Sequence, residues 1–138
     1  MSRQLSFAFL ALCFAAMLAA CGGTNGPSTS LKVTTTDFAF SPNTFTVPAG
    51  QTISLHITNN GAVAHSLIIM KAGMQVENHF SDTNPSSIYW QEAPVPPGNS
   101  IQTTFTAPSE PGEYQIVCGV SGHLEAGMVA KLFVVAQP

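Results

Sequence analysis

The sequence predicts an all-β protein, a Greek-key β-sandwich of about seven to eight strands. Short runs in which apolar and polar residues alternate recur along the chain, and clusters of Gly, Pro, Asn and Ser separate them. The length of 138 residues suits one domain. Short strands with such regular turn signals are typical of sandwiches.

The expected strands begin at residue 31. In the clearest of them, Ile53, Leu55 and Ile57 alternate with polar residues, which predicts one buried and one solvent-facing side. The expected strands are 31–38, 44–47, 52–59, 65–71, 100–107, 113–118 and 128–135. Turn signals at 41–43, 48–50, 59–61 and 108–112 separate them.

Residues 71–99 do not follow a strand pattern. A structureless loop of this length is uncommon in a compact domain, so we expect an irregular or short-helix insertion. The short helix is expected over 72–80, and the apolar and aromatic residues at 88–90 are expected to pack back onto the domain. Three prolines within 94–97 argue against an ordinary central strand or helix there.

The N-terminus has the features of a secretory signal. Arg3 precedes an apolar run over 5–18, which is shorter than the roughly 20 residues of a membrane span. The run ends in Leu-Ala-Ala-Cys, which resembles the bacterial lipoprotein cleavage box. That resemblance implies a lipoprotein signal peptide over 1–20 and lipidation of Cys21. The composition of 22–30, rich in Gly, Ser and Thr, predicts that 21–30 form a lipid-anchored flexible linker. The alternative is ordinary secretory cleavage, with Cys21 incidental.

The remaining residues, 31–138, are expected to form the one folded domain. Charged residues make up only 8% of the chain, against about 25% in average soluble proteins. Because Arg3 is the only arginine, the rest carries three Lys against seven Asp and Glu, a net charge of −4. Nucleic-acid binding is therefore not expected, since nothing basic is present to neutralise phosphates.

Cysteine placement points to a metal. Cys13 lies in the apolar leader and Cys21 at the expected processing site, so Cys118 has no obvious disulfide partner in an exported protein. A free thiol there is open to oxidation unless something occupies it, and a metal ion would do so.

Cys118 opens a glycine-rich segment in which potential metal ligands recur at even spacing. His123 follows five residues later and Met128 five residues after that. A thiolate, two imidazoles and a weak thioether are the ligands of a blue copper site, and His65 is the candidate for the second imidazole. The alternative for Cys118 alone is a small buried hydrophobic residue, a common fate of free cysteine.

Strand parity supports an inward-facing sulfur, because Tyr114 and Ile116 share a strand face with Cys118. Gly122 and Gly127 directly precede two of the proposed ligands and permit the turns that the loop needs.

The other candidate donors are less well placed. His56 falls on the polar side of its strand, and His79 lies in the irregular insertion. Met70 and Met74 are interpreted as packing residues. Zinc is the main alternative to copper, but methionine is not among its usual ligands. In a zinc site, Glu125 would be the alternative fourth ligand.

Together these residues resemble the cupredoxin family of small blue copper proteins. In that family a His ahead of a strand is the first ligand, matched by His65, and one loop supplies Cys, His and Met, matched by Cys118, His123 and Met128. The Cys-x4-His-x4-Met spacing is similar to that of the auracyanin and rusticyanin loops. The resemblance covers roughly 32–135 and implies one type 1 copper ion.

One departure from the family concerns Ser66, which follows the first His where many relatives have Asn. We expect its hydroxyl to bond the backbone near Cys118 and so to tune the sulfur.

The resemblance also implies a function. The expected protein is a monomeric, extracytoplasmic, membrane-tethered one-electron carrier, not an enzyme, that cycles copper between Cu(II) and Cu(I). Its expected partners are respiratory or photosynthetic membrane complexes or other electron-transfer proteins. The alternatives are a copper-binding or storage protein, a copper oxidase or nitrite-reductase-like domain, and a plain adhesion module. The enzyme is disfavoured because such enzymes use extra His clusters and this chain has four His.

Overall fold

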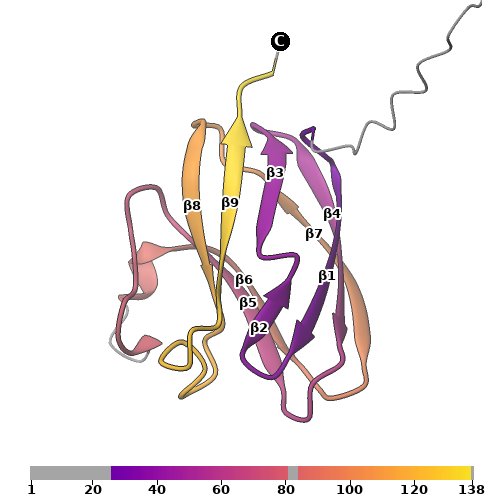
Figure 1. Ribbon diagram of the computed structural model, residues 1–138. Coiled ribbons are helices and arrows are strands. Elements are labelled where there is room, and N and C mark those ends of the chain that lie inside the picture. Colours follow the sequence, from indigo (N-terminus) through magenta and orange to yellow (C-terminus); the bar gives the residue numbers. More distant parts are fainter. Residues whose placement is uncertain (1–25, 81–83, 138) are drawn as a thin grey trace, which may run out of the picture.

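The computed structural model describes residues 26–80 and 84–137, and in these residues the chain is a two-layered β-sandwich (Figure 1). The strands are β1 (Ser30–Thr36), β2 (Ala39–Ser41), β3 (Thr44–Pro48), β4 (Thr52–Asn59), β5 (His65–Met70), β6 (Ile88–Val95), β7 (Ser100–Thr106), β8 (Gly112–Val117) and β9 (Val129–Val135). The predicted all-β class is confirmed. The described residues form nine strands rather than seven or eight.

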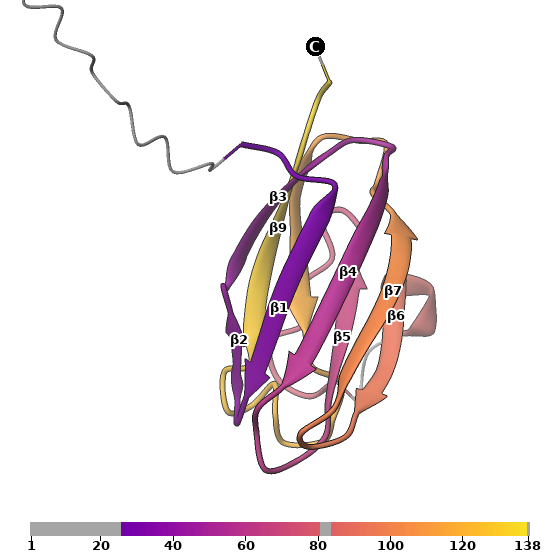
Figure 2. The same ribbon diagram turned by 90° about the vertical axis from the view of Figure 1, so that its right-hand side faces the viewer.

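Each layer is a mixed sheet. One sheet has four strands in the order β2-β1-β4-β7, and the other has five in the order β3-β9-β8-β5-β6. β1 runs parallel to β4 and β3 parallel to β9, whereas the other neighbours are antiparallel. Figure 2 shows β1, β4 and β7 in front of β5 and β9.

The core lies between the sheets and follows the alternation of the sequence. On β4, Ile53, Leu55 and Ile57 are at most 1% exposed, while the residues between them face outward. Removing such a buried side chain from a packed core costs about 2–5 kcal/mol. The apolar residues of β4 therefore hold the four-stranded sheet against the other.

β5 differs from the other strands because all six of its residues are buried. Leu67 and Ile69 face the main core, whereas Ile68 and Met70 belong to a second cluster on the outer side of the sheet. Val76 and Phe80 of the segment between β5 and β6, together with Ile88 at the start of β6, pack against that side. Strand β5 is thus enclosed, and it carries His65 at its first position.

The prediction of a short helix over 72–80 is wrong. Within the described chain, 72–79 form a turn and irregular backbone, and the helical element that the structure shows further on is the 3-10 turn Pro85–Ser87. Gln115 of β8 explains the difference. Its side-chain oxygen accepts the Val76 N–H at 2.7 Å and its amide donates to the Val76 carbonyl at 3.0 Å, so these backbone groups need no helix.

β6 and β2 were not expected as strands. β6 accommodates Pro94 because it is the edge strand of its sheet, where a missing N–H breaks no ladder. The expected strand over 31–38 ends earlier, and Asp37 and Phe38 form a two-residue turn into β2. Phe38 adopts a φ of +65°, a conformation that favours glycine.

Some expectations about the N-terminus lie outside the described residues. These are the signal peptide over 1–20 and Cys21. The last residues of the expected linker are hydrogen-bonded to the domain, because Ser28 N–H donates to Thr46 and Ser54 N–H to Thr29. In the part of the chain that the structure covers, no helix is long and apolar enough to cross a bilayer.

Candidate metal centre

Three buried side chains from separate segments meet at one end of the sandwich. His65 begins β5, Cys118 directly follows β8, and His123 lies in the loop to β9. One donor atom from each lies within 4.8 Å of the others. The two histidine Nδ1 atoms are 3.1 Å apart, and the Cys118 sulfur is 3.4 Å from the His123 Nδ1. The structure therefore brings together three of the four residues of the predicted ligand set.

Sheet pairing explains how distant residues converge. β5 and β8 are neighbours, and Ile68 pairs with Val117 directly before Cys118. The inward orientation expected from parity is confirmed, since Tyr114, Ile116 and Cys118 are 3%, 2% and 0% exposed. The sulfur is therefore held in the core by the packing of its strand.

The loop after Cys118 closes on itself through backbone hydrogen bonds. Met128 N–H donates to the His123 carbonyl at 3.0 Å, and Cys118 N–H donates to the Met128 carbonyl at 3.3 Å. Gly122 and Gly127 have φ of +85° and +90°, a region that glycine enters without steric cost. The closed loop thus brings the backbone of Met128 within hydrogen-bond distance of both Cys118 and His123.

Met128 is fully buried in the main core cluster beside Cys118. Its backbone is hydrogen-bonded to the backbones of both Cys118 and His123. Its role as the weak thioether ligand remains a prediction.

Ser66 connects the ligand loop to β5. Its hydroxyl oxygen accepts the Gly119 N–H at 2.9 Å and lies 3.8 Å from the Cys118 sulfur. Gly119 also packs closely, because a Cβ there would lie 2.5 Å from Ile68 Cδ1. The backbone directly after Cys118 is thus fixed by one hydrogen bond and by close packing.

The surroundings keep His123 in the form that binds metals. Burial lowers the pKa of His123, and the neighbouring His65 lowers it further, while Asp37 and Glu125 partly oppose this. A neutral imidazole is the metal-binding form of histidine.

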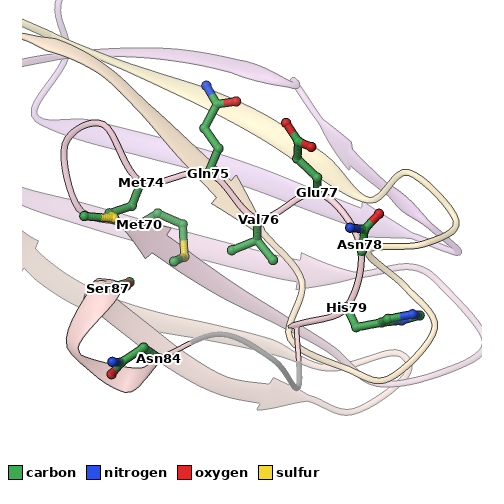
Figure 3. A pocket seen from close by; sticks show the side chains of 9 residues that line it. All are labelled: Met70, Met74, Gln75, Val76, Glu77, Asn78, His79, Asn84 and Ser87. Carbon is green, nitrogen blue, oxygen red and sulfur yellow. The ribbon is translucent and has the colours of Figure 1, made fainter.

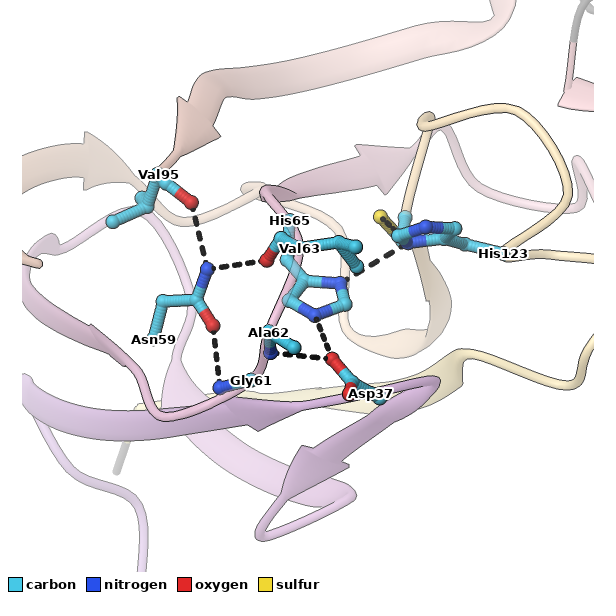
Figure 4. A network of polar contacts seen from close by, with 9 residues as sticks. Asp37, Asn59, Gly61, Ala62, Val63, His65, Val95 and His123 are labelled. Atoms are coloured by element: carbon cyan, nitrogen blue, oxygen red, sulfur yellow. Dashed lines mark hydrogen bonds and ion pairs between the residues drawn. The ribbon is translucent and has the colours of Figure 1, made fainter. Parts of the chain in front are cut away.

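Asn59, which the sequence analysis did not single out, organises the loop before His65 (Figure 4). This fully buried side chain donates to the Val63 and Val95 carbonyls at 2.8 Å each and accepts the Gly61 N–H at 2.8 Å. An Asn at a strand end before Gly reads as an ordinary turn, so its three bonds were not evident.

Asp37 and Phe38 are the other residues that the sequence analysis missed. The Asp37 carboxylate lies 3.5 Å from the His65 Nε2, and the Phe38 ring makes an edge contact with the His123 ring, with centroids 5.2 Å apart. Each contact joins two loops far apart in the chain, so no local pattern reveals it. One hairpin turn therefore touches both histidines of the centre.

The remaining candidate donors lie elsewhere. His79 Nδ1 is 2.6 Å from a Glu125 carboxylate oxygen, and this hydrogen bond lowers the pKa of Glu125. His56 is half-buried on β4. Glu125 is therefore engaged outside the cluster and is a poor zinc ligand there.

Beside the insertion lies a separate open cavity of about 290 Å³ (Figure 3). Met70 and Met74 both line it, together with Val76, His79 and Ser87. Met70 is fully buried and packs as expected, whereas Met74 is 48% exposed. None of His65, Cys118 and His123 lines this cavity.

The three clustered donors fit a copper ion. Imidazole nitrogens bound to one small metal ion at about 2.0–2.1 Å lie a little over 3 Å apart, in agreement with the 3.1 Å between the histidines. Thiolate and imidazole together suit copper or zinc. The site is therefore a buried three-donor metal centre in a β-sandwich.

Comparison with known proteins agrees with a metal centre in a β-sandwich. The pattern of the cupredoxin-like domain matches residues 6–130, and the chain belongs to the cupredoxin family. It is 35% identical over 136 residues to auracyanin-A of Chloroflexus aurantiacus, covering 79% of this chain and 83% of that protein. It is 32% identical over 134 residues to chloroplastic plastocyanin of Oryza sativa subsp. indica, a match that covers 97% of this chain and 78% of that protein.

A solved structure is similar as well. The dithionite-reduced auracyanin of Roseiflexus castenholzii has a TM-score of 0.68 and 30% identity, covering 82% of this chain and 100% of that one. The expected copper cofactor is in keeping with these relatives and with the His-Cys-His cluster. The relatives are small copper proteins, in agreement with the expectation that this chain is not an enzyme.

Proposed function

We propose that the protein is a one-electron carrier that works outside the cytoplasm. The observation that carries this proposal is the buried cluster of His65, Cys118 and His123, whose donor atoms lie within 4.8 Å of one another. Copper bound there supplies a one-electron couple. We assign Met128 as the weak fourth ligand on the basis of its loop spacing and its burial.

The protein's own residues keep the centre rigid and dry. The three donors are 1%, 0% and 6% exposed, so water is excluded from the metal position. The Ser66 and Asn59 hydrogen bonds fix the two segments that carry Cys118 and His65. A site that is already assembled needs little rearrangement when its charge changes, which favours rapid electron transfer.

The route to a partner leads past His123. Phe38 covers its ring and is 46% exposed, and Val63, from the loop before His65, is 43% exposed. We call the surface formed by Phe38, Val63, Ala64 and Ala126 the apolar end. These four residues carry no charge, while the carboxylates of Asp37 and Glu125 lie beside them. A mainly apolar surface of this kind suits brief encounters with membrane redox complexes or other electron-transfer proteins, which typically bury less than about 1,200 Å².

Attachment to a membrane is part of the proposal. The lipoprotein-like sequence before Cys21 supports lipidation of that residue, and a monomer on a short tether would reach partners at the outer face of a membrane. Intact-mass analysis of the protein from its native membrane tests this, because lipidation adds acyl mass to a chain that begins at Cys21. An unmodified chain would leave the carrier soluble and remove this part of the proposal.

Adding copper(II) to the purified apoprotein tests the carrier function. We expect an intense thiolate-to-copper absorption that disappears on reduction and returns on oxidation. Cys118→Ser should remove the absorption, whereas His56→Gln, outside the centre, should keep it. A colourless adduct, or a colour that does not cycle, would favour a storage protein and reject the carrier.

A further inference from the structure

The second ring nitrogen of His65 has an unusual environment. The His65 Nδ1 lies 3.1 Å from the His123 Nδ1. When Nδ1 binds the metal through its lone pair, the proton of the neutral ring must sit on Nε2. That atom is buried and has no hydrogen-bond partner at ordinary distance among the residues described. The nearest charged group is the Asp37 carboxylate, whose Oδ1 lies 3.5 Å away.

Asp37 does not reach this position by chance. The same oxygen accepts the Ala62 N–H at 2.8 Å, which ties the turn between β1 and β2 to the loop before His65 (Figure 4). Gly61 leaves the space for the contact, because a Cβ there would lie 2.5 Å from Asp37 Oδ1 and 2.8 Å from His65 Nε2. A larger residue at Gly61 would push the carboxylate and the imidazole apart.

We propose that Asp37 is a positioning residue of the metal centre, which holds the His65 ring through Nε2 and favours the oxidised state. This inference rests on the proposed copper function of His65. A carboxylate behind a metal-binding histidine fixes the ring and its tautomer and increases its donor strength. Because oxidation adds a positive charge to the centre, the nearby negative charge stabilises the oxidised form. The Asp37 side chain is 44% exposed, so salt partly screens this effect.

The test compares the reduction potentials of two charge-neutralising variants. Asp37→Asn keeps an oxygen for the Ala62 N–H and removes only the charge. Glu110→Gln is the matched control, since Glu110 precedes β8 and Cys118 follows it, at opposite ends of that strand. We expect Asp37→Asn to raise the potential. At a fixed applied potential, the ratio of oxidised to reduced protein should fall on the order of tenfold, equivalent to about 59 mV. Glu110→Gln should change the reduction potential much less. High salt should narrow the difference in potential between Asp37→Asn and the parent.

A second measurement does not use the redox couple. In the diamagnetic, reduced protein, the Nε2 proton of His65 should exchange with water faster in Asp37→Ala than in the parent, and copper affinity in a chelator competition should fall by about 10–100-fold. Equal potentials in Asp37→Asn and Glu110→Gln, with unchanged proton exchange in Asp37→Ala, would overturn the proposal. If the proposed function itself failed, the parent protein would show no thiolate-to-copper absorption, which separates the two outcomes.

Discussion

At the scale of single residues, the Ser66 hydroxyl joins β5 to the start of the ligand loop. Ser66→Ala leaves the Gly119 N–H without its 2.9 Å partner in a partly buried position. We expect the unfolding free energy of the apoprotein to fall by about 1–2 kcal/mol, measured by urea denaturation. The potential should shift too, because the hydroxyl 3.8 Å from the Cys118 sulfur is lost.

The control for that variant is Ser100→Ala, which removes an exposed hydroxyl bonded to Thr58 at 3.0 Å on the other sheet. It should leave the potential unchanged. A Ser66→Ala protein with the parent's potential would show that the hydroxyl supports the loop without tuning the sulfur.

Met128 tests the weak fourth ligand. Met128→Leu nearly conserves volume in a fully buried position, so the fold should lose less than about 1.5 kcal/mol. The strong colour should remain because the thiolate and both imidazoles are untouched, while the potential should rise as the oxidised state loses a donor. A redox titration measures the shift, with Met70→Leu as the buried control from the outer cluster. Loss of all copper binding would contradict a weak axial role.

At the scale of elements, the strands with clear alternation were predictable and the segments supported by distant contacts were not. The alternation of Ile53, Leu55 and Ile57 identified β4 because a half-buried strand imposes a period of two. β6 escaped detection because Pro94 argues against a strand unless its edge position is known. The helix expected over 72–80 failed because Gln115, 39 residues from Val76, takes up its backbone hydrogen bonds.

The metal centre divides in the same way. Cys118, His123 and Met128 follow one another in a single loop, so their spacing was visible in the sequence. Asp37 acts across 25 residues on the loop before His65, through a contact that exists only after β1 and β4 have paired. Sequence patterns report local geometry, and this support comes from tertiary packing.

β8 carries a prediction about pH. Burial raises the pKa of Tyr114 above its usual value near 10, with smaller contributions from Glu110 and Tyr89. A raised pKa of an acid means that the folded state resists ionisation. The stability that this gives is complete below about pH 10 and is lost as the pH rises through the folded-state pKa.

Tyr114→Phe should therefore act in two ways. Below pH 10 it should lower the unfolding free energy of the apoprotein by about 1 kcal/mol, because the 2.8 Å hydrogen bond to the Glu110 carbonyl is lost. Above pH 10 the unfolding free energy of the variant should decline less steeply with rising pH than that of the parent. Denaturation between pH 7 and 11 measures both. Tyr89→Phe, which loses an exposed hydrogen bond to the Thr106 carbonyl, is the control for the loss of stability below pH 10. An equal alkaline slope in the parent and Tyr114→Phe would contradict the assignment.

At the scale of the whole molecule, the sandwich places the metal centre and the proposed partner surface, the apolar end, on the same side. The turn between β1 and β2, the loop before β5 and the loop after β8 all reach this end (Figure 1). Asp37 and Glu125 are the charged residues that act on His123 at this end, and the chain outside Arg3 has only three Lys and seven Asp and Glu in all. Encounters should therefore depend on apolar contact at the apolar end more than on long-range steering.

Val63→Glu tests whether electrons pass through this end. Two copies that meet there would each bring a new negative charge into a drying contact, so we expect electron self-exchange to slow by about tenfold at low salt. NMR line broadening in mixtures of oxidised and reduced protein measures the rate. Thr104→Glu adds the same charge on the exposed face of β7, opposite Ser54 and far from the Asn59 end of β4. If both variants exchange at the same rate while their potentials match, electrons leave elsewhere, since overall charge alone would then account for the change.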